Sequence, residues 1–316
     1  MDARSGRPPA IVVVGSMNID LIAYARRAPG PGETVIGDRF VTGFGGKGAN
    51  QAVMARLLGA EVAFVGALGD DPYATMTLDN FARLGVDASA VMRMAGSSGV
   101  APIWVEADGT NRIIVVSGAN DLVTPGHAAV AVAAAPRVDV VVGQFEVPQA
   151  VTAAAFAAAR ARGAVTVLNP APAAPIAPAL LAVADWLIPN EVEFGVLAGA
   201  GDDTSDAAMW AFARRTGSRI LVTLGSRGAA LVSPDGTVAR VPAPSVTALD
   251  TTGAGDAFVG AFAVGLALGL TELDAVRLGI ACASDSVTRP GTQASFPDPA
   301  RCAVLLAAVH GTGDRS

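Results

Sequence analysis

The sequence predicts an α/β fold in which a mostly parallel central sheet is flanked by helices and carries a small β-lid. Strand-like runs alternate with helical patterns along most of the 316 residues, which is the order of βαβ units. The runs are almost wholly apolar, as in Val138–Gly143, and this is typical of parallel strands covered on both faces. Two regions, Leu21–Thr42 and Gly99–Val116, break the alternation and predict the lid.

Strands and helices of the expected core alternate along the chain. Buried strands are predicted at Ile11–Gly15, Val62–Ala67, Val138–Gly143, Ala164–Asn169, Asp185–Pro189 and Arg219–Leu224. Helical patterns cover Gly48–Leu58, Pro72–Leu84, Val147–Arg162 and Ala207–Thr216. The uncharged run Ala257–Leu270 indicates a further core helix, because it is shorter than the roughly 18–20 apolar residues that span a membrane.

The two irregular regions carry turn signals. The first contains Pro29-Gly-Pro-Gly32, and the second predicts a hairpin whose turn is Glu106–Thr110. We expect the segments at about 19–44 and 97–119 to form the lid over the main sheet. The alternative is that they are edge strands of the core.

The chain as a whole predicts one domain at 10–310, with flexible tails at 1–9 and 311–316. The first residues lack the apolar segment of a signal peptide, and Cys282 and Cys302 lie in apolar helical contexts typical of reduced, buried thiols. These features favour a cytoplasmic protein without a membrane segment. A net charge of −6 and a pI of about 4.9 argue against a nucleic-acid partner, because such binding relies on Lys and Arg.

Polar residues follow the predicted strands at the points where the strands end. In open parallel sheets, ligands bind beyond these carboxyl ends. For any one of these residues a helix N-cap is the alternative role, but all of them together favour a polar cleft. They are Asn18, Asp20, Gln144, Glu146, Asn169, Asn190, Glu193 and Thr223.

The strongest local signal is Asp250-Thr-Thr-Gly-Ala-Gly-Asp256, which precedes the apolar core helix. Gly253 and Gly255 allow a tight turn that exposes backbone N–H groups at a helix N-terminus, and such a turn binds anions. Asp256 is then either a helix cap or a base. Beside bound phosphate a carboxylate is repelled, unless it accepts the proton of an attacking hydroxyl. This motif alone leaves both roles open.

A second glycine-rich stretch, Gly43–Asn50, contains Lys47, the only lysine among 22 basic residues. Its retention suggests that the site needs a compact ammonium group, although chance is the alternative. The stretch is not a P-loop, because Gly48 stands where Ser or Thr is required, and Gly15–Asn18 lacks the glycines of a dinucleotide fingerprint. The Gly43–Asn50 stretch suits close approach of the backbone to a small polyol. The two histidines lie far from these motifs, which disfavours a Ser-His-Asp triad or a histidine metal site.

With these motifs the chain resembles the ribokinase-type sugar kinases of the PfkB carbohydrate kinase family, from about Ile11 to Ala308. The most specific matches are the Gly45–Gln51 loop and the Asp250–Asp256 motif. Supporting matches are Gly15–Asp20, Pro31–Thr34, Leu168–Pro172 and Thr223–Gly228. The resemblance implies a ribokinase-like three-layer fold and transfer of a phosphoryl group from ATP to the 5-hydroxyl of a pentose.

The resemblance also implies roles for individual residues, with Asp256 as the general base. The sugar would be bound by Asn18, Asp20, Gly46, Lys47, Asn50, Glu146 and Asp256. ATP would contact Asn190, Thr223, Gly225, Ser226 and Gly228, and its transferring phosphoryl group would meet the backbone of Gly253, Ala254 and Gly255. Glu193, with Asn190, would organise Mg²⁺ through water. A monovalent cation, K⁺, would be held by Asp250, Thr252, Ser286, Arg289, Gly291 and Ser295.

The resemblance leaves the pentose open between D-ribose and 2-deoxy-D-ribose. Asp20–Tyr24, Ser97–Ile103 and Gly291–Pro297 are more similar to deoxyribokinases, but the polar sugar contacts are the same on either interpretation. Alternatives are a related kinase acting on a nucleoside, pseudouridine or fructose, and a non-catalytic sugar-binding regulator, which the intact anion motif disfavours. A homodimer through the lid is expected. Ile280 departs from the polar residue that some relatives place near the adenine.

Overall fold

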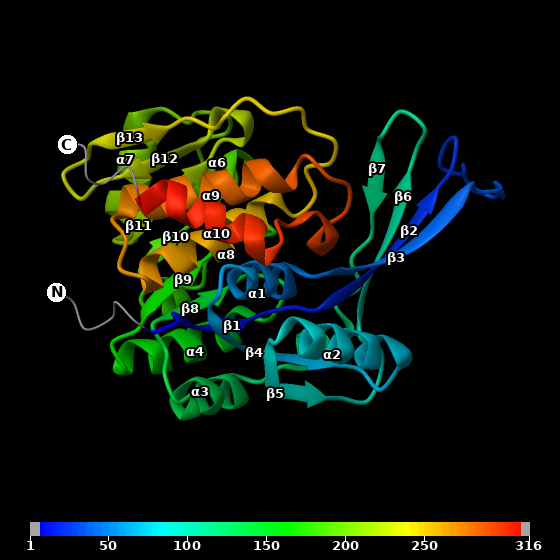
Figure 1. Cartoon of the computed structure of the whole chain (residues 1–316), viewed down its shortest axis with the longest axis horizontal. Helices are drawn as coiled ribbons and strands as arrows, with labels where there is room; N and C mark the ends of the chain where they lie inside the picture. The colour runs from blue at the N-terminus through cyan, green and yellow to red at the C-terminus, as the bar shows by residue number, and fades with distance from the viewer. Residues whose placement is uncertain (1–6, 311–316) are drawn as a thin grey trace.

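The computed structural model describes residues 7–310, and in this part of the chain a nine-stranded sheet has the order β13-β12-β11-β10-β9-β8-β1-β4-β5 (Figure 1). Neighbouring strands from β5 to β11 pair in parallel, while β12 and β13 add an antiparallel edge. The strands are β1 (Ala10–Val14), β4 (Glu61–Leu68), β5 (Asp87–Arg93), β8 (Val140–Gly143), β9 (Val165–Leu168), β10 (Trp186–Leu187), β11 (Arg219–Thr223), β12 (Ala229–Val232) and β13 (Val238–Val241).

Helices cover both faces of this sheet and enclose two apolar cores. In β1, Ile11 and Val13 belong to one core and Val12 and Val14 to the other, because alternate side chains of a strand point to opposite faces. The first core includes α1 (Lys47–Leu57), α2 (Pro72–Leu84), α8 (Ala254–Ala267), α9 (Glu272–Ser286) and α10 (Pro299–His310). The second includes α3 (Pro125–Ala134), α4 (Gln149–Ala161), α5 (Pro178–Leu181), α6 (Glu191–Ala198) and α7 (Asp206–Thr216). Sheet and helices thus form the predicted three layers.

The predicted core strands are all present with slightly shifted ends, and the predicted helices correspond to α1, α2, α4, α7 and α8. The helix expected at Ala257–Leu270 begins earlier, at Ala254, because Gly253 is its N-cap in a left-handed conformation (φ 77°). The apolar runs did not predict β5, β12 or β13. The first and last of these strands lie at the edges of the sheet and are only partly buried, so they lack a continuous apolar run.

A separate four-stranded sheet, called the small sheet below, stands beside the main body (Figure 1). Its order is β3-β2-β6-β7, from β2 (Asn18–Tyr24), β3 (Arg39–Gly45), β6 (Gly99–Val105) and β7 (Asn111–Ile113). The hairpin prediction is confirmed, since β6 and β7 pair antiparallel. Within residues 7–310 no strand of this sheet pairs with the nine-stranded sheet, so the alternative of core edge strands is wrong.

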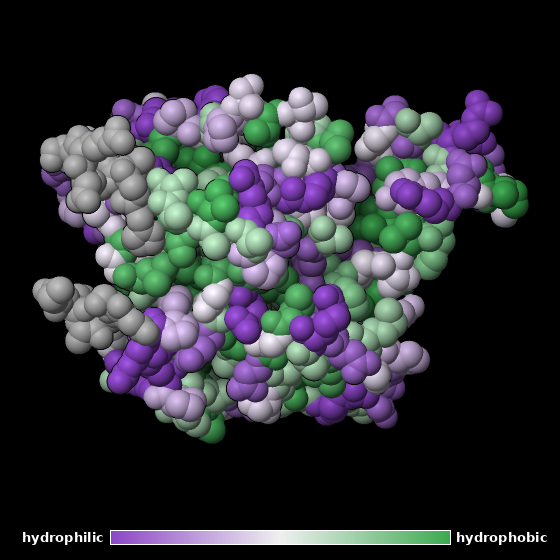
Figure 2. Space-filling model, in the orientation of Figure 1, coloured by the Kyte–Doolittle hydropathy of each residue, from purple (hydrophilic) through white to green (hydrophobic). Residues whose placement is uncertain are grey.

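The small sheet exposes apolar side chains on a region that projects from the main body (Figure 2). Ile36 in the loop between β2 and β3 is 90% exposed, and Phe40 in β3 is 63% exposed. Further exposed apolar residues of the small sheet and its edges are Val41, Ile113, Ile114, Val115 and Val116. Such a concentration on one element is more than the scattered apolar exposure of an ordinary surface.

At the described N-terminal end, packing begins slightly earlier than the sequence suggested. Pro9 is buried and its carbonyl accepts from the N–H of Glu61 at 2.8 Å. The rest of the expected tails, 1–6 and 311–316, lies outside the described residues. Cys282 and Cys302 are buried and free, as predicted. Of the helices that the structure describes, none has the length and apolar character to cross a membrane.

The packing of α8 against α1 positions the candidate site. The two helices meet at Gly260, where an added Cβ atom would lie 2.6 Å from the backbone oxygen of Gln51. The glycine therefore allows a close approach of the two backbones. This approach brings the first turn of α8 against the first turns of α1, beside the carboxyl ends of β1 and β8 and next to the small sheet.

Candidate active site

Asp256 lies in the first turn of α8 but does not cap it. The N-cap is Gly253, and the Asp256 carboxylate instead accepts from Asn50 Nδ2 at 2.8 Å and from Gln51 Nε2 at 2.9 Å. The residue is only 7% exposed. Burial raises the pKa of Asp256, although Lys47 and the two amide donors oppose that shift. A buried carboxylate with a raised pKa and a fixed orientation is suited to accept a proton.

The sugar residues expected from the sequence converge on one cavity of about 480 Å³ between the main body and the small sheet. It is lined by Asn18, Asp20, Gly46, Lys47, Asn50, Glu146 and Asp256. Apolar side chains of the small sheet and its edge, among them Ile103 and Val115, cover part of it. The cavity therefore presents a polar floor and a largely apolar cover to a small ligand.

Asp20 and Glu146 are two acidic residues of this cavity with different surroundings. Burial raises the pKa of Asp20 to about 7, and repulsion from Glu146 and Asp256 adds to the shift, while a hydrogen bond from Thr292 opposes it. Glu146 accepts from Ser16 Oγ at 2.5 Å and from the Lys47 N–H at 2.9 Å. Glu146 thus also fixes the start of α1, beyond the sugar contact that was predicted.

Lys47 lies at the boundary between the sugar cavity and a smaller cavity of about 170 Å³ that the anion loop lines. Burial lowers its pKa, but nearby carboxylates outweigh burial and leave the pKa raised, so the ammonium stays charged. These carboxylates are Asp256, Glu146 and Glu193. Lys47 therefore borders both cavities.

The smaller cavity is lined by Gly253, Gly255 and Asp256 on one side and by Asn190 and Glu193 on the other. Asn190 and Glu193 form a capping box at the start of α6, each side chain accepting from the other's N–H at 2.8 Å. Burial raises the pKa of Glu193. In residues 7–310 no three acidic, His or Cys side chains gather into a metal cluster. This donor set fits Mg²⁺ held by phosphates, water and one carboxylate, not a cage of protein ligands.

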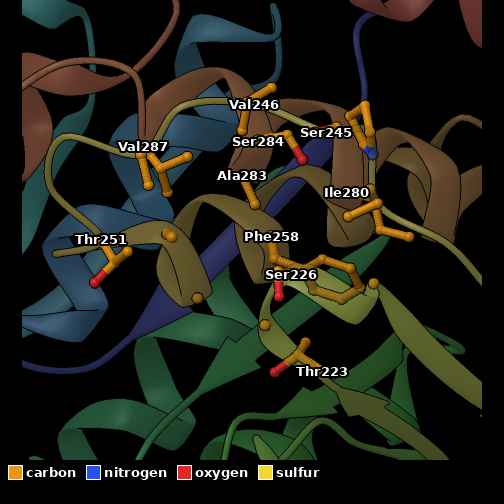
Figure 3. Close-up of a pocket in the computed structure, with 17 residues that line it drawn as sticks. Thr223, Ser226, Ser245, Val246, Thr251, Phe258, Ile280, Ala283, Ser284 and Val287 are labelled. Carbon is orange, nitrogen blue, oxygen red and sulfur yellow. The ribbon is translucent and has the colours of Figure 1, made fainter.

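A third cavity, of about 420 Å³, continues from the anion loop and is shown in Figure 3. Predicted ATP contacts that line it are Thr223, Gly225, Ser226, Gly228, Ala254 and Gly255. Asn190 and Gly253 line the smaller cavity instead. Apolar side chains line most of the remainder, with Phe258, Ile280 and Val246 labelled in Figure 3, next to the hydroxyls of Ser245, Thr251 and Ser284. The sugar and nucleotide cavities therefore lie on opposite sides of the first turn of α8.

The residues expected to hold a monovalent cation come from two segments that meet beside the anion loop. Asp250 accepts from the N–H groups of Thr252 and Gly291, both at 2.9 Å. Burial acts to raise the pKa of Asp250, but hydrogen bonds from the Thr252 side chain and from these two N–H groups leave the pKa lowered. Arg289 donates to the carbonyl of Ser295 at 3.0 Å. Ser286 donates its hydroxyl to the Ala283 carbonyl within its own helix.

Sequence reasoning missed a set of amide side chains around Asp256 and Asn18. Gln51 Nε2 also donates to Asn169 Oδ1 at 3.1 Å, and Gln144 Nε2 donates to Gln51 Oε1 at 2.6 Å. Asn18 Oδ1 accepts from Asn120 Nδ2 at 2.8 Å. Gln144 and Asn169 were singled out only as polar residues after strands. Asn120 and the contacts of Gln51 carried no signal, because their partners are far away in the sequence.

Comparisons with known proteins show the family to which the chain belongs. Residues 9–299 match the family described as pfkB family carbohydrate kinase. A deoxyribokinase of Salmonella typhi is 37% identical over 292 residues, which cover 91% of this chain and 95% of that protein, and a ribokinase of Bacillus subtilis is 38% identical over 288 residues, which cover 91% and 96%. The structure of Arabidopsis thaliana ribokinase complexed with ribose and ATP has a TM-score of 0.86 at 31% identity and covers 95% of this chain and 99% of that one. The chain belongs to the pfkB family of carbohydrate kinases.

Proposed function

We propose that this protein transfers the γ-phosphoryl group of ATP to the 5-hydroxyl of a pentose, D-ribose or 2-deoxy-D-ribose, and releases the 5-phosphate and ADP. The observation that carries the proposal is that Asp256 lines both the sugar cavity and the smaller cavity beside the anion loop. A hydroxyl in the first cavity could therefore reach both a base and a phosphoryl group. Relatives named ribokinase and deoxyribokinase support the same reaction.

In this mechanism the polar floor of the sugar cavity orients the pentose with its 5-hydroxyl at Asp256. The carboxylate accepts the hydroxyl proton as the oxygen attacks phosphorus, and the bond between the γ-phosphorus and the bridging oxygen breaks, so that ADP leaves. The backbone N–H groups of Gly253–Gly255 and the Lys47 ammonium stabilise the transferring group. Mg²⁺ bound by the ATP phosphates, with Glu193 nearby, would offset their negative charge.

The preferred pentose determines whether the enzyme is a ribokinase or a deoxyribokinase, and a panel of acceptors tests the proposal. Initial rates with ATP are compared for D-ribose and 2-deoxy-D-ribose, with fructose, a nucleoside and pseudouridine as further acceptors, and kcat/KM is determined for each. The proposal expects one of the two pentoses to give the highest value. A higher kcat/KM for a nucleoside, pseudouridine or fructose would contradict it.

Activation by K⁺ belongs to the same proposal. A cation between Asp250 and the Ser286–Ser295 segment would hold the backbone that leads into the anion loop, and preorganised donors lower a barrier. The test titrates KCl against choline chloride at matched ionic strength, in a buffer with a bulky organic cation. We expect higher rates in KCl, and less activation by NaCl. Equal rates in KCl and choline chloride would contradict the cation site.

A homodimer through the small sheet and a cytoplasmic location complete the proposal. The exposed apolar residues of the small sheet support the dimer, since pairing would remove them from water. Sedimentation velocity on the wild-type protein and on Phe40→Glu tests it, with Val130→Glu on α3 as a control at a similarly exposed valine. We expect a dimer that Phe40→Glu alone dissociates.

A further inference from the structure

A chain of side-chain hydrogen bonds runs from Asp256 to the surface of α2. Asn50 donates from Nδ2 to Asp256 at 2.8 Å, and Asn50 Oδ1 accepts from Gln293 Nε2 at 3.1 Å. Gln293 Oε1 accepts from Asn80 Nδ2 at 3.0 Å, and Asn80 Oδ1 accepts from the Arg83 guanidinium at 2.6 Å. Gln293 lies in the short helix η3 (Gln293–Ser295), so the chain joins α8, α1, η3 and α2.

The chemistry of the two ends determines the orientation of every amide between them. An ionised carboxylate only accepts hydrogen bonds, so Asn50 has to present its NH₂ group to Asp256. A guanidinium only donates, so Asn80 has to present its oxygen to Arg83. Gln293 in the middle must therefore accept from Asn80 and donate to Asn50. Reversal of any one amide would set two donors or two acceptors against each other.

The second donor to Asp256 is held differently. Gln51 shares its Nε2 group between Asp256 and Asn169, and its Oε1 accepts from Gln144. One arm of this branch ends inside the protein at Gln144, whose buried Oε1 has no hydrogen-bond partner within residues 7–310, and the other ends at Asn169, whose Nδ2 donates to the Ile188 carbonyl at 2.9 Å. No charged group at its far end fixes the amide orientation, in contrast to Arg83 in the Asn50 branch.

We propose that Gln293 is a positioning residue for phosphoryl transfer, which acts through Asn50 by keeping the Asn50 NH₂ group on the carboxylate of Asp256. The inference rests on the role of Asp256 as the base that is proposed above. Gln293 can hold this orientation because it bonds to two nearly buried asparagines. Asn50 and Asn80 are each only 4% exposed, and Gln293 itself is half-buried. The neighbouring Thr292 contacts Asp20 of the small sheet through its hydroxyl at 3.4 Å.

A misplaced Asn50 has a consequence that can be measured as a pH dependence. Asn50 stabilises the ionised carboxylate, so its loss raises the pKa of Asp256 further. The charged groups that face Asp256 are Lys47 of α1, which lowers this pKa, and the acidic residues Glu146, Asp20 and Glu193. The base works only when ionised, so kcat rises with pH through the pKa. A higher pKa moves the acidic limb of the kcat profile to higher pH.

The test compares kcat and pentose KM across pH for the wild type, Gln293→Met and Gln293→Glu. Methionine removes both hydrogen bonds without adding charge, and glutamate can only accept, which favours rotation of Asn50 away from its present orientation. We expect kcat at neutral pH to fall by about tenfold with methionine and by more with glutamate. The acidic limb should move up by about one pH unit, with KM changed less than about threefold.

Two further variants show whether the effect passes through Asn50. In an Asn50→Ala background, Gln293→Met should add less than about a twofold loss, because the residue through which it acts is gone. The control is Gln149→Glu, a half-buried glutamine that also donates and accepts through its amide but lies at the start of α4. It should keep wild-type kinetics.

Three results would overturn the proposal. The first is a folded Gln293→Met protein with wild-type kcat and an unmoved acidic limb. The second is an undiminished effect of Gln293→Met in the Asn50→Ala background. The third does not depend on turnover: a crystal structure of Gln293→Met in which the Asn50–Asp256 hydrogen bond keeps its 2.8 Å length and its orientation. Failure of the wild type to phosphorylate either pentose would instead contradict the proposed function, and this structural result would still test Gln293.

Discussion

The sugar cavity and the nucleotide cavity adjoin the same turn of α8 but differ in the side chains that they offer. The sugar cavity contains three acidic residues, two asparagines of the predicted set and Lys47. Among the described residues that line the nucleotide cavity, the polar side chains are hydroxyls of Ser and Thr, and the rest are apolar or glycine. A site built from hydrogen-bonding groups rejects a ligand that lacks the matching group much more strongly than an apolar site does. We therefore expect strict choice of the acceptor and looser choice of the donor base.

The largest effect is expected where the two cavities meet. Asp256→Asn keeps the size of the side chain but removes the proton acceptor, so kcat should fall by a factor on the order of 10²–10⁴. Sugar binding should remain largely intact, as measured by titration calorimetry with the pentose. A variant that keeps near wild-type kcat would show that Asp256 is not the base.

A smaller effect is expected for Lys47→Arg. The guanidinium keeps the charge but is bulkier and planar. Lys47 is the first residue of α1 and lies between Gly46 and Gly48, whose backbones closely approach residues 15–18 at the junction of β1 and β2. We expect KM for the pentose to rise about tenfold, which corresponds to a loss of about 1.4 kcal/mol of binding free energy. Because Lys47 also lines the smaller cavity, kcat should fall as well. Unchanged KM and kcat would favour chance as the reason for this lysine.

Asp20 makes sugar binding depend on pH. Its pKa is raised to about 7, so the ionised fraction grows between pH 6 and pH 8. Sugar hydroxyls donate to the ionised carboxylate, and the dissociation constant of the pentose should therefore fall about tenfold over this interval. Calorimetry at several pH values measures it. Asp20→Asn should bind more weakly and lose the pH dependence, whereas the same slope in that variant would assign the titration to another group.

The smallest effect concerns the nucleotide base. With GTP in place of ATP, kcat/KM should change by less than about tenfold, because hydroxyl and apolar side chains distinguish the two bases mainly by shape. Rates with saturating pentose and varied nucleotide measure this. A preference for ATP above about a hundredfold would mean that backbone groups around Ala243–Ala248 form hydrogen bonds specific to adenine. The two cavities would then differ less in selectivity than their side chains suggest.

The sequence predicted most of what apolar runs and local motifs encode. The central parallel strands, the helices α1, α2, α4, α7 and α8, and the hairpin of the small sheet follow from continuous apolar runs, periodicity and turn residues. The edge strands β5 and β13 were missed, because partly buried strands lack a continuous apolar run. The short buried strand β12 was missed as well, so local pattern is a good guide to long apolar runs and a poor one to short or partly buried strands.

In the candidate site, too, the sequence predicted residues that belong to local motifs and missed contacts between distant segments. The glycine-rich motifs around Lys47 and Asp256 are contiguous in the sequence, and the structure brings them together at one cavity. Gln293 lies in the deoxyribokinase-like run Gly291–Pro297, but nothing in that run indicated its role, because its partner Asn50 is 243 positions away and an amide has no distinctive pattern. The motif could not distinguish a cap from a base for Asp256 either. That distinction depends on which atoms contact its carboxylate, and these belong to another helix.

The close approach of α8 to α1 at Gly260 limits how this enzyme can be altered. A substitution of Gly260 by alanine, a common way to strengthen a helix, would force the two helices apart at the point that brings Asp256 to its amide donors. Thermal stability and catalytic rate are therefore linked at one residue of the core. Mutations selected for heat resistance should accumulate on outer helices such as α7 and spare the contact between α8 and α1. Mutations that loosen this contact should lower the catalytic rate before they unfold the protein.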